Sequence, residues 1–571
     1  MRKKRRKILL VVSALVLLSV TTIVIVVNSR LKSIVEGKIE QVLNENNNFS
    51  YKVNFEKLKL NWLTQSIILK GVTIAPENLI KSGNKDVNAS AFFFKMRSLR
   101  IRRINIVEAI RNKKIDIGEI VIMNPEISVL INKKNGEKKT GGTDKNRTTH
   151  FSLDSIALKK INGVSLGKII LENAEITIYR DIKLNSAPLL TMENLSIFLE
   201  GITVDKLSPQ SVYYKIRVAS YHISGNNHSI NLPGNKYKLS FENIILDKDQ
   251  GRITIDYFKL KPKENIYKLA AKQNPSKEVY DIKTDKITLN GVDIKDIISN
   301  GRFYLNSIDV AGADILIVKD KRMPENLDKR PLFPNQLLYR LDIPLKIDTV
   351  SIENTFLQYS ERLKTSKRLM TVQFSKINSK IFNISTKPSR HPVVIDFKGK
   401  LMKKVACSIN VSMPVNATGD FTFNGKVGKG SFVLFNKATQ PIGLVFNGGY
   451  LNELVFQGKG NSKYAYGKLI MKYQDIKVKV IDNSNVKKEK GFLSWAANKI
   501  LRTSNPVKGK LRENTMFFER IPNKGFPGFL WKTVFSGLKA TLIPSFEKSN
   551  SKAVSNLFDT GKKRKGNKKK R

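Results

Sequence analysis

The sequence predicts a mainly β protein: an elongated, curled, repetitive β-sheet enclosing a groove, with one N-terminal transmembrane helix and short C-terminal helices. Three observations support this prediction. An uncharged apolar run fills residues 8–27, apolar residues then recur with a period of two, and one strand unit repeats along the chain. The chain has 571 residues, of which 41% are hydrophobic and 26% charged, enough apolar material for a sizeable core.

Residues 1–30 are predicted to be a cytoplasmic basic tail and a membrane anchor. The twenty residues from Ile8 to Val27 carry no charge and would span about 30 Å as a helix, the thickness of a bilayer core. The preceding MRKKRRK is strongly basic, which by the positive-inside rule keeps this end in the cytoplasm and sends the rest across. A cleaved signal peptide is the alternative, but this apolar run is too long and Asn28-Ser29-Arg30 is a poor cleavage site.

Residues 31–48 are predicted to form an amphipathic helix. Its apolar residues recur at helical spacing, with charged residues between them. They are Leu31, Ile34, Val35, Ile39, Val42 and Leu43.

Residues 49–390 are predicted to form a repetitive β-groove. In the repeated unit, an apolar residue is followed by others at offsets three and five. Four copies extend further, with Asn or Gly at offset seven; these copies begin at Ile117, Leu166, Leu305 and Ile347. The offset-seven residues tolerate a left-handed backbone, so each is expected to mark a kink that lets the sheet curl. These residues are Asn124, Asn173, Gly312 and Asn354.

An ordinary β-sandwich is the alternative, since its two apolar faces would cover each other. The extended copies are spaced by about 40 to 50 residues or multiples of it, which instead favours an array growing along one axis. With few helices to cover it, the apolar face would line a groove suited to acyl chains. The groove candidates are Ile120, Ile122, Ile169, Leu171, Tyr221, Ile223, Phe258, Leu260, Ile308, Val310, Val350 and Ile352.

Two further segments adjoin these repeats. Residues 133–149 are a polar loop between repeats. Residues 391–485 alternate apolar and polar residues between Gly, Asn and Pro, which predicts an antiparallel meander completing the groove, with a soft boundary near residues 387–391. The meander is expected to include GSFVLFN as a strand.

Residues 486–550 are predicted to be a C-terminal cap or interface segment, with a helix from Pro527 to Leu542. The helix could cover the open end of the sheet, as solenoids require. Alternatively, its aromatic residues beside lysines could touch a membrane or a membrane partner. The interfacial candidates are Phe529, Leu530, Trp531, Val534 and Phe535. Residues 551–571 are expected to be a basic, disordered tail.

The composition also limits the chemistry. A formal charge of +53 makes polyanions the expected neighbours. Cys407 is the only cysteine, and the four histidines are spread along the chain; His222 and His228 resemble loop residues. No phosphate-binding loop or nucleophile elbow is present. We therefore expect no enzyme activity, no cofactor and no metal.

The pattern resembles the AsmA-like envelope proteins of Gram-negative bacteria, whose relatives include TamB and YhdP. The resemblance rests on the basic tail and single anchor, the strand pair in residues 54–76, the repeated strand units, and the C-terminal segments 458–482 and 491–506. It implies a curled β-sheet with an apolar groove, an inner-membrane anchor with the bulk of the chain in the periplasm, and residues 391–485 as the family's C-terminal region. It supplies no catalytic residues.

The expected function is to carry or shield phospholipid in the groove for outer-membrane lipid homeostasis. The expected partners are the inner-membrane bilayer, phospholipid acyl chains and anionic headgroups, with an outer-membrane or envelope protein as a further candidate. One alternative is an envelope assembly factor that aids outer-membrane protein insertion. Another is a membrane protein that binds polyanions, but nucleic acid is not expected because the predicted topology opposes it.

Overall fold

The structure, a computed structural model, describes residues 36–37, 40–41, 51–61, 64–76, 91–130, 163–179, 188–206, 214–232, 234–294, 296–297, 301–386, 390–481 and 499–567. In these residues the protein is mainly β, as predicted, with 25 strands that pair in both parallel and antiparallel fashion. The predicted anchor, most of the predicted amphipathic helix and the loop 133–149 lie outside these ranges. Among the described helices, none has the length and apolar character needed to cross a bilayer.

The chain divides into two compact units, which are described separately. Unit 1 comprises Met1–Leu232 and Ser240–Asp249, and unit 2 comprises Pro233–Leu239 and Gln250–Arg571. This division does not coincide with the boundary near residues 387–391 suggested by the sequence. There, strands β18 (Leu369–Ser385) and β19 (Val393–Leu401) pair directly with each other.

Unit 1 is built mainly from long strands that pair with their neighbours along the chain. Its elements are β1 (Tyr51–Asn54), β2 (Lys57–Asn61), β3 (Ser66–Pro76), β4 (Ala91–Ile104), α2 (Ile106–Arg111), β5 (Lys114–Met123), β6 (Glu126–Leu130), β7 (Gly163–Tyr179), β8 (Leu190–Lys206) and β9 (Tyr214–Asn231). Strand β10 (Tyr237–Asp247) follows and belongs partly to each unit.

Unit 2 begins with short strands and ends with a meander and helices. Its first elements are β11 (Arg252–Asp256), β12 (Lys259–Pro262), α3 (Ile266–Ala271), β13 (Glu278–Lys283), β14 (Lys286–Asn290), β15 (Phe303–Ala311), β16 (Asp314–Asp320), α5 (Pro334–Arg340) and β17 (Leu345–Arg362), followed by β18 and β19. The later ones are β20 (Val405–Met413), β21 (Phe421–Val427), β22 (Gly430–Ser431), α6 (Asn436–Thr439), β23 (Leu444–Gly460), β24 (Tyr464–Val480), β25 (Glu513–Glu519), α8 (Phe526–Leu542) and α9 (Pro544–Asn567).

The four extended repeat copies pair two by two, in register. β5 and β6 lie parallel to β7, with Ile117 opposite Leu166. β15 and β16 lie parallel to β17, with Leu305 opposite Ile347. Equivalent positions of the repeat are therefore direct neighbours, so an apolar position in one copy extends the apolar row of the next.

The predicted kinks are confirmed. The backbone is left-handed at all four offset-seven positions: Asn124 (φ 50°), Asn173 (φ 52°), Gly312 (φ 64°) and Asn354 (φ 46°). The β7–β8 register shifts next to Asn173, and the β17–β18 register shifts next to Asn354. At Gly312, a Cβ atom would collide with the carboxylate of Asp285, so a larger residue in this copy would force the Asp285 side chain to move.

The terminal strand of unit 1 has its edge groups satisfied by side chains. Val53 of β1 donates its backbone N–H group to Glu40 Oε1 at 2.8 Å, and Phe55, just after β1, donates its own to Glu36 Oε1 at 3.2 Å. Residues 36–37 and 40–41 are helical, which agrees with the predicted helix where the structure describes it. Edge strands with free backbone groups invite aggregation, so these carboxylates protect this end.

The meander from β19 to β24 is confirmed as antiparallel, with one correction. The segment GSFVLFN is not a strand: only Gly430–Ser431 pair, and a 3₁₀ turn follows over Phe432–Phe435. The Ser431 hydroxyl accepts a hydrogen bond from the N–H of Val433 and starts this turn. The turn lets Phe432 enter the core.

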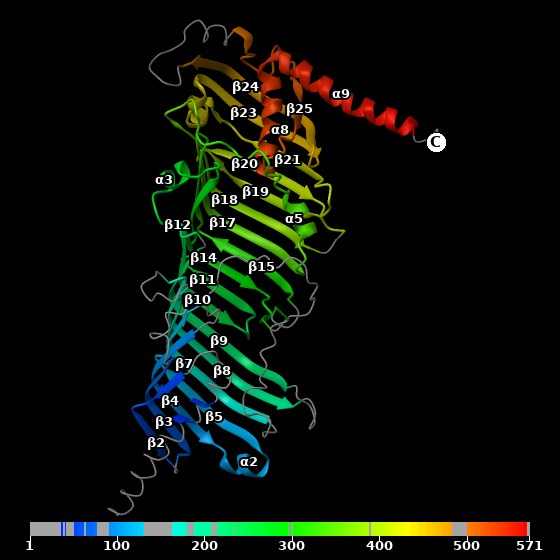
Figure 1. The fold of residues 1–571 in the computed structure, drawn as a ribbon. Coiled ribbons are helices and arrows are strands. Elements are labelled where there is room, and N and C mark those ends of the chain that lie inside the picture. The colour runs from blue at the N-terminus through cyan, green and yellow to red at the C-terminus, as the bar shows by residue number, and fades with distance from the viewer. Residues whose placement is uncertain are drawn as a thin grey trace, which may run out of the picture. The chain divides into compact units, whose positions relative to one another are not determined.

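The C-terminal end also differs from expectation. The predicted helix at 527–542 is confirmed as α8, which packs on β24 and β25 (Figure 1). The chain is helical again through α9 as far as Asn567, where a disordered tail was expected from residue 551. The first turns of α9 are held to β25, because Asn550 Nδ2 donates a hydrogen bond to the carbonyl of Thr515 at 2.8 Å.

Candidate functional site

Unit 1 has two apolar rows that cross seven neighbouring strands. Paired residues on adjacent strands point to the same face of a sheet, so each row follows from the strand register. The first row is Leu60, Ile67, Ile101, Ile120, Ile169, Leu199 and Tyr221; the second is Leu58, Leu69, Leu99, Ile122, Leu171, Ile197 and Ile223. Six of the predicted groove residues are therefore brought together on one face.

The opposite face of unit 1 is charged. Arg102 on β4 pairs with Glu119 on β5 at 3.1 Å, and Lys168 on β7 pairs with Glu200 on β8 at 3.5 Å. Glu119 and Lys168 are themselves opposite each other in the register. The four residues form a row of alternating charge, so the sheet of unit 1 is amphipathic.

Unit 2 has two corresponding rows. The first is Ile253, Leu289, Ile308, Val350, Ile381, Ile395, Val411 and Phe423; the second is Ile255, Ile287, Val310, Ile352, Ser379, Phe397 and Ile409. They contain Ile308, Val310, Val350 and Ile352 of the predicted groove. Ser379 interrupts the second row, and its hydroxyl is satisfied by the carbonyl of Asp396 at 2.9 Å.

The last two groove candidates lie on or next to β12 of unit 2. Leu260 on β12 pairs with Ile282 on β13. Phe258 precedes β12, and its carbonyl accepts from Thr284 N at 2.9 Å. All twelve groove candidates are half-buried, so each keeps part of its side chain accessible.

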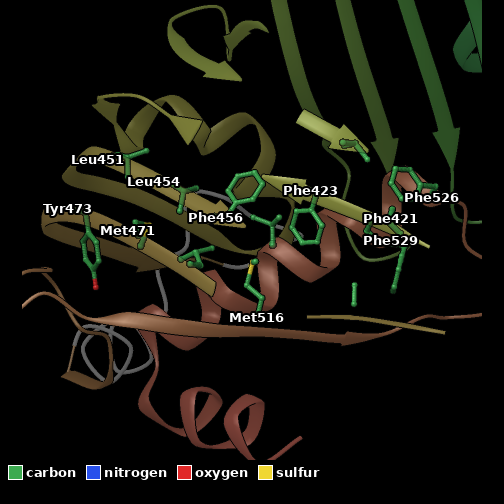
Figure 2. Close-up of a cluster of buried hydrophobic side chains, with 14 of the residues drawn as sticks. Phe421, Phe423, Leu451, Leu454, Phe456, Met471, Tyr473, Met516, Phe526 and Phe529 are labelled. Atoms are coloured by element: carbon green, nitrogen blue, oxygen red, sulfur yellow. The ribbon is translucent and has the colours of Figure 1, made fainter. Parts of the chain in front are cut away.

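The apolar face of unit 2 is covered at its C-terminal end by α8. Phe529 of α8 is 1% exposed and lies against Phe421 of β21 at 6.1 Å between ring centroids. Phe526 contacts the same ring at 5.0 Å. Figure 2 shows these rings together with Phe423, Phe456 and Met516 in one buried cluster. This end of the face is therefore a closed hydrophobic core.

The five interfacial candidates on α8 divide into two groups, and only one group is exposed as an interface requires. Phe529 and Val534 are buried in the core and Leu530 packs against it, because their side of the helix meets β24 and β25. Trp531 and Phe535 are instead 58% and 40% exposed. Their rings stack on each other at 5.7 Å between centroids, so only these two form an exposed aromatic pair.

The Trp531–Phe535 pair has basic neighbours. Lys539 Nζ lies 5.5 Å from the ring of Phe535 and 4.6 Å from the ring of Phe546, which lies in the first turn of α9. Exposed aromatic side chains beside lysine suit either a lipid headgroup region or a protein partner.

Two cavities of the described structure lie away from the groove candidates. One of about 610 Å³ in unit 1 has a mixed polar lining that includes Arg103, Asp116 and Glu200. One of about 480 Å³ in unit 2 is lined by Arg330, Lys463 and other residues. No groove candidate lines either of these two cavities, so the candidate site is defined by the apolar rows.

His222, His228 and Cys407 lie in strands of the sheet. His222 and His228 are not loop residues, since β9 runs through both. His228 is 1% exposed, beside Phe241 at 4.9 Å between ring centroids. Burial raises the pKa of Cys407 to about 11, which keeps this thiol protonated near neutral pH. Within the described ranges, His, Cys, Asp and Glu form no group of three that could hold a metal.

Comparisons with known proteins leave the site to be judged on its geometry. No protein-family model matches the chain, and no curated protein shows significant similarity to it.

Proposed function

We propose that this protein is an inner-membrane-anchored periplasmic protein that carries or shields phospholipid on the apolar faces of its sheets. In this proposal each face curls into a groove, and lipid handling serves outer-membrane lipid homeostasis. The observation that carries the proposal is the set of in-register apolar rows, opposite a charged face in unit 1. Acyl chains gain about 0.8 kcal/mol for each buried CH₂, so such rows suit them.

The half-exposed state of the groove candidates supports the proposal. A closed core would bury these side chains fully, as it does Phe421 and Met516, which are at most 2% exposed. The groove candidates instead retain accessible apolar surface, as binding surfaces for apolar ligands do. The anchor predicted at residues 8–27 would hold the chain at the bilayer that supplies the lipid.

Photocrosslinking tests this proposal with a matched control on each strand. A photoreactive amino acid replaces Ile120, Ile169 or Ile308 in one set of full-length proteins. In the control set it replaces the adjacent Glu119, Lys168 or Asp309, whose side chains point to the opposite face. We expect lipid adducts by mass spectrometry in the first set only. Equal labelling of both sets, or purified folded protein without lipid, would contradict lipid carriage.

The second candidate function is assistance in outer-membrane protein insertion through protein contacts. The exposed Trp531–Phe535 pair favours it, because exposed aromatic clusters are frequent at protein interfaces. Replacing both residues with alanine separates the two functions. Both functions predict unchanged lipid content in this double variant, so partner binding is the readout that separates them. An assembly role predicts loss of the partner protein in the double variant and no dependence of function on the apolar rows, whereas lipid carriage predicts the reverse.

The topology has its own test. The reporter is an enzyme that is active only in the periplasm. Fused after Arg571, it is expected to be active. Activity confined to the cytoplasm would contradict the proposed orientation and would favour a polyanion-binding role for the +53 chain.

A further inference from the structure

Along one part of the apolar face of unit 2, the side chains change from aliphatic to aromatic to charged. Phe374 contacts Phe397 of the second apolar row at 5.6 Å between ring centroids, which places Phe374 and its strand partner Leu357 on that face. From Leu357, the alternation of side chains along β17 puts Tyr359 and then Glu361 on the same face.

The strand register extends each of these positions into a row across β13, β16, β17 and β18. The row next to the kink at Asn354 is aliphatic and aromatic and consists of Ile282, Ile315, Leu357 and Phe374. The next row is Tyr280, Ile317, Tyr359 and Val372. The last row is Glu278, Lys319, Glu361 and Met370. The order from apolar side chains through tyrosine to charge is also the order from the chains of a lipid to its headgroup.

The charged row is part of a larger group of ion pairs, here called the Lys532 cluster. Lys319 Nζ lies 2.8 Å from Glu278 Oε1, and Lys321 Nζ lies 2.8 Å from Glu361 Oε1. Lys524, just before α8, forms an ion pair with Glu325. The members are Glu278, Lys319, Lys321, Glu325, Glu361, Lys524 and Lys532.

Lys532 is the lysine of this cluster without an acidic partner. It is half-buried on α8, and no described carboxylate forms an ion pair with it. Its ammonium group lies 5.5 Å from the centroid of the Phe518 ring. The other three lysines are matched by the three glutamates, so the cluster carries one surplus positive charge.

The electrostatics of Lys532 agree with this count. Burial lowers the pKa of Lys532, and the nearby charges of Lys524 and Lys321 lower it further, against opposing contributions from Glu325 and Glu361. An anion placed beside the ammonium group would relieve both effects.

The neighbouring groups do not already serve as that anion. Burial alone would raise the pKa of Glu325, but hydrogen bonding to Lys524 lowers it, so this carboxylate is charged. Its Oε2 atom is held by Lys524, whereas its buried Oε1 atom has no hydrogen-bond partner among the described residues. Glu361 is 5% exposed and accepts a hydrogen bond from the Tyr359 hydroxyl at 2.7 Å in addition to its ion pair with Lys321.

We infer that the Lys532 cluster binds the phosphate of an anionic lipid headgroup whose acyl chains lie on the adjacent apolar rows of unit 2. This inference rests on the proposed lipid function and assigns an orientation to it. Lys532 contributes the unmatched charge, and the tyrosine row lies at the level of the glycerol backbone. The positive charge of the Lys532 cluster favours a phosphate-bearing amphiphile over a neutral apolar ligand.

The test measures headgroup preference in the full-length protein. The purified protein is stripped of lipid in detergent and exchanged with mixed micelles of phosphatidylglycerol and phosphatidylcholine, and bound lipid is quantified by mass spectrometry. We expect Lys532→Gln to lower the ratio of bound anionic to zwitterionic lipid by about tenfold, the factor given by one charge-assisted hydrogen bond of roughly 1.4 kcal/mol. Total bound lipid should stay close to that of the unaltered protein.

Three comparisons make the result specific. Lys532→Arg keeps the charge and should keep the preference. Lys398→Gln removes an exposed lysine on β19, outside the cluster, and should leave the ratio unchanged. Inorganic phosphate is titrated into the stripped protein as a separate arm; saturable binding of phosphate alone that disappears in Lys532→Gln would overturn the lipid assignment.

The two proposals fail in different ways. If the unaltered, folded protein takes up no lipid from the micelles, the proposed function fails. If it takes up lipid but Lys532→Gln leaves the headgroup ratio unchanged, the lipid function stands and the headgroup site is wrong.

Discussion

Both units contain the same repeated strand unit, but their apolar faces are covered to different extents. In each, a pair of extended repeat copies lies parallel and in register, and apolar rows result. In unit 2 one end of the apolar face is closed by α8, which gives a core that includes Phe421, Met516 and Phe529. In unit 1 the main described core is much smaller and centres on Phe55, Leu69 and Met96. The repeat therefore creates an apolar face, and other segments decide how much of it is covered.

The largest expected effect comes from removing the side chain that closes the face of unit 2. Phe529→Ala leaves a cavity between α8 and Phe421 and should lower the free energy of unfolding of unit 2 by about 3–5 kcal/mol. Segment-resolved hydrogen exchange on the full-length protein measures this and should show no change in unit 1. Phe535→Ala on the exposed side of α8 is the matched control, with an expected cost below about 1 kcal/mol. Equal costs for the two variants would contradict the assignment of α8 as a cap.

The next effect tests whether the kinks of the two units are equivalent. Asn173 in unit 1 and Asn354 in unit 2 are both exposed and left-handed. Asn173→Val and Asn354→Val should each cost about 1–2 kcal/mol, because a β-branched residue is strained in this conformation. Asn→Gly at the same positions should change stability by less than about 1 kcal/mol. Denaturant unfolding with hydrogen-exchange readout measures both pairs; a cost in one unit only would show that the kinks are not equivalent.

The kinks also show how far sequence reasoning reached. Their positions followed from Asn or Gly at a fixed offset in the repeat, and all four are left-handed. The apolar period predicted the rows, because equivalent repeat positions become neighbours in the sheet. Both signals are local along the chain, so no knowledge of distant contacts was needed to read them.

The features that sequence reasoning missed depend on contacts between distant segments. Glu278, Lys319 and Glu361 each look like ordinary polar strand residues, and only the pairing of β13, β16 and β17 places them in one row. On α8, the sequence offered both Trp531 and Val534 as interfacial candidates, but the position of β25 decides that Val534 is buried and Trp531 exposed. The direction from which a sheet meets a helix is not encoded in the helix alone.

The smallest effect concerns the different response of the two units to acid. In unit 1, neither ring nitrogen of His228 has a hydrogen-bond partner. Burial lowers its pKa, against smaller opposing contributions from the Gly225 backbone and the charge of Glu193. In unit 2, burial alone would raise the pKa of Glu278, but the hydrogen bond and charge of Lys319 lower it overall.

These shifts act in different pH windows. The folded-state pKa of His228 lies below its unfolded value near 6.5. Its contribution to the free energy of unfolding of unit 1 is therefore fully present above that pH. It is lost as the pH falls toward the folded-state pKa, by at most about 1.4 kcal/mol per pH unit. The stabilisation from Glu278 is present above its unfolded value of 4.5 and is lost only as the pH falls below it. Between pH 7.5 and pH 5.5, the His228 contribution should therefore weaken unit 1 while the Glu278 contribution to unit 2 stays intact.

Hydrogen exchange at pH 7.5 and 5.5, corrected for the intrinsic rate, measures this difference in the full-length protein. His228→Leu keeps an apolar side chain against Phe241 and should remove most of the acid sensitivity of β8 and β9. His222→Gln, at an exposed histidine of the same strand, is the matched control and should leave that sensitivity in place. If His228→Leu responds to pH as the unaltered protein does, the acid sensitivity of unit 1 has another origin. In that case, loss of the exposed ion pairs of unit 1 would explain its lower stability in acid. Because such pairs contribute modestly and are screened by salt, raising the ionic strength at pH 7.5 would lower the stability of unit 1 in the same way.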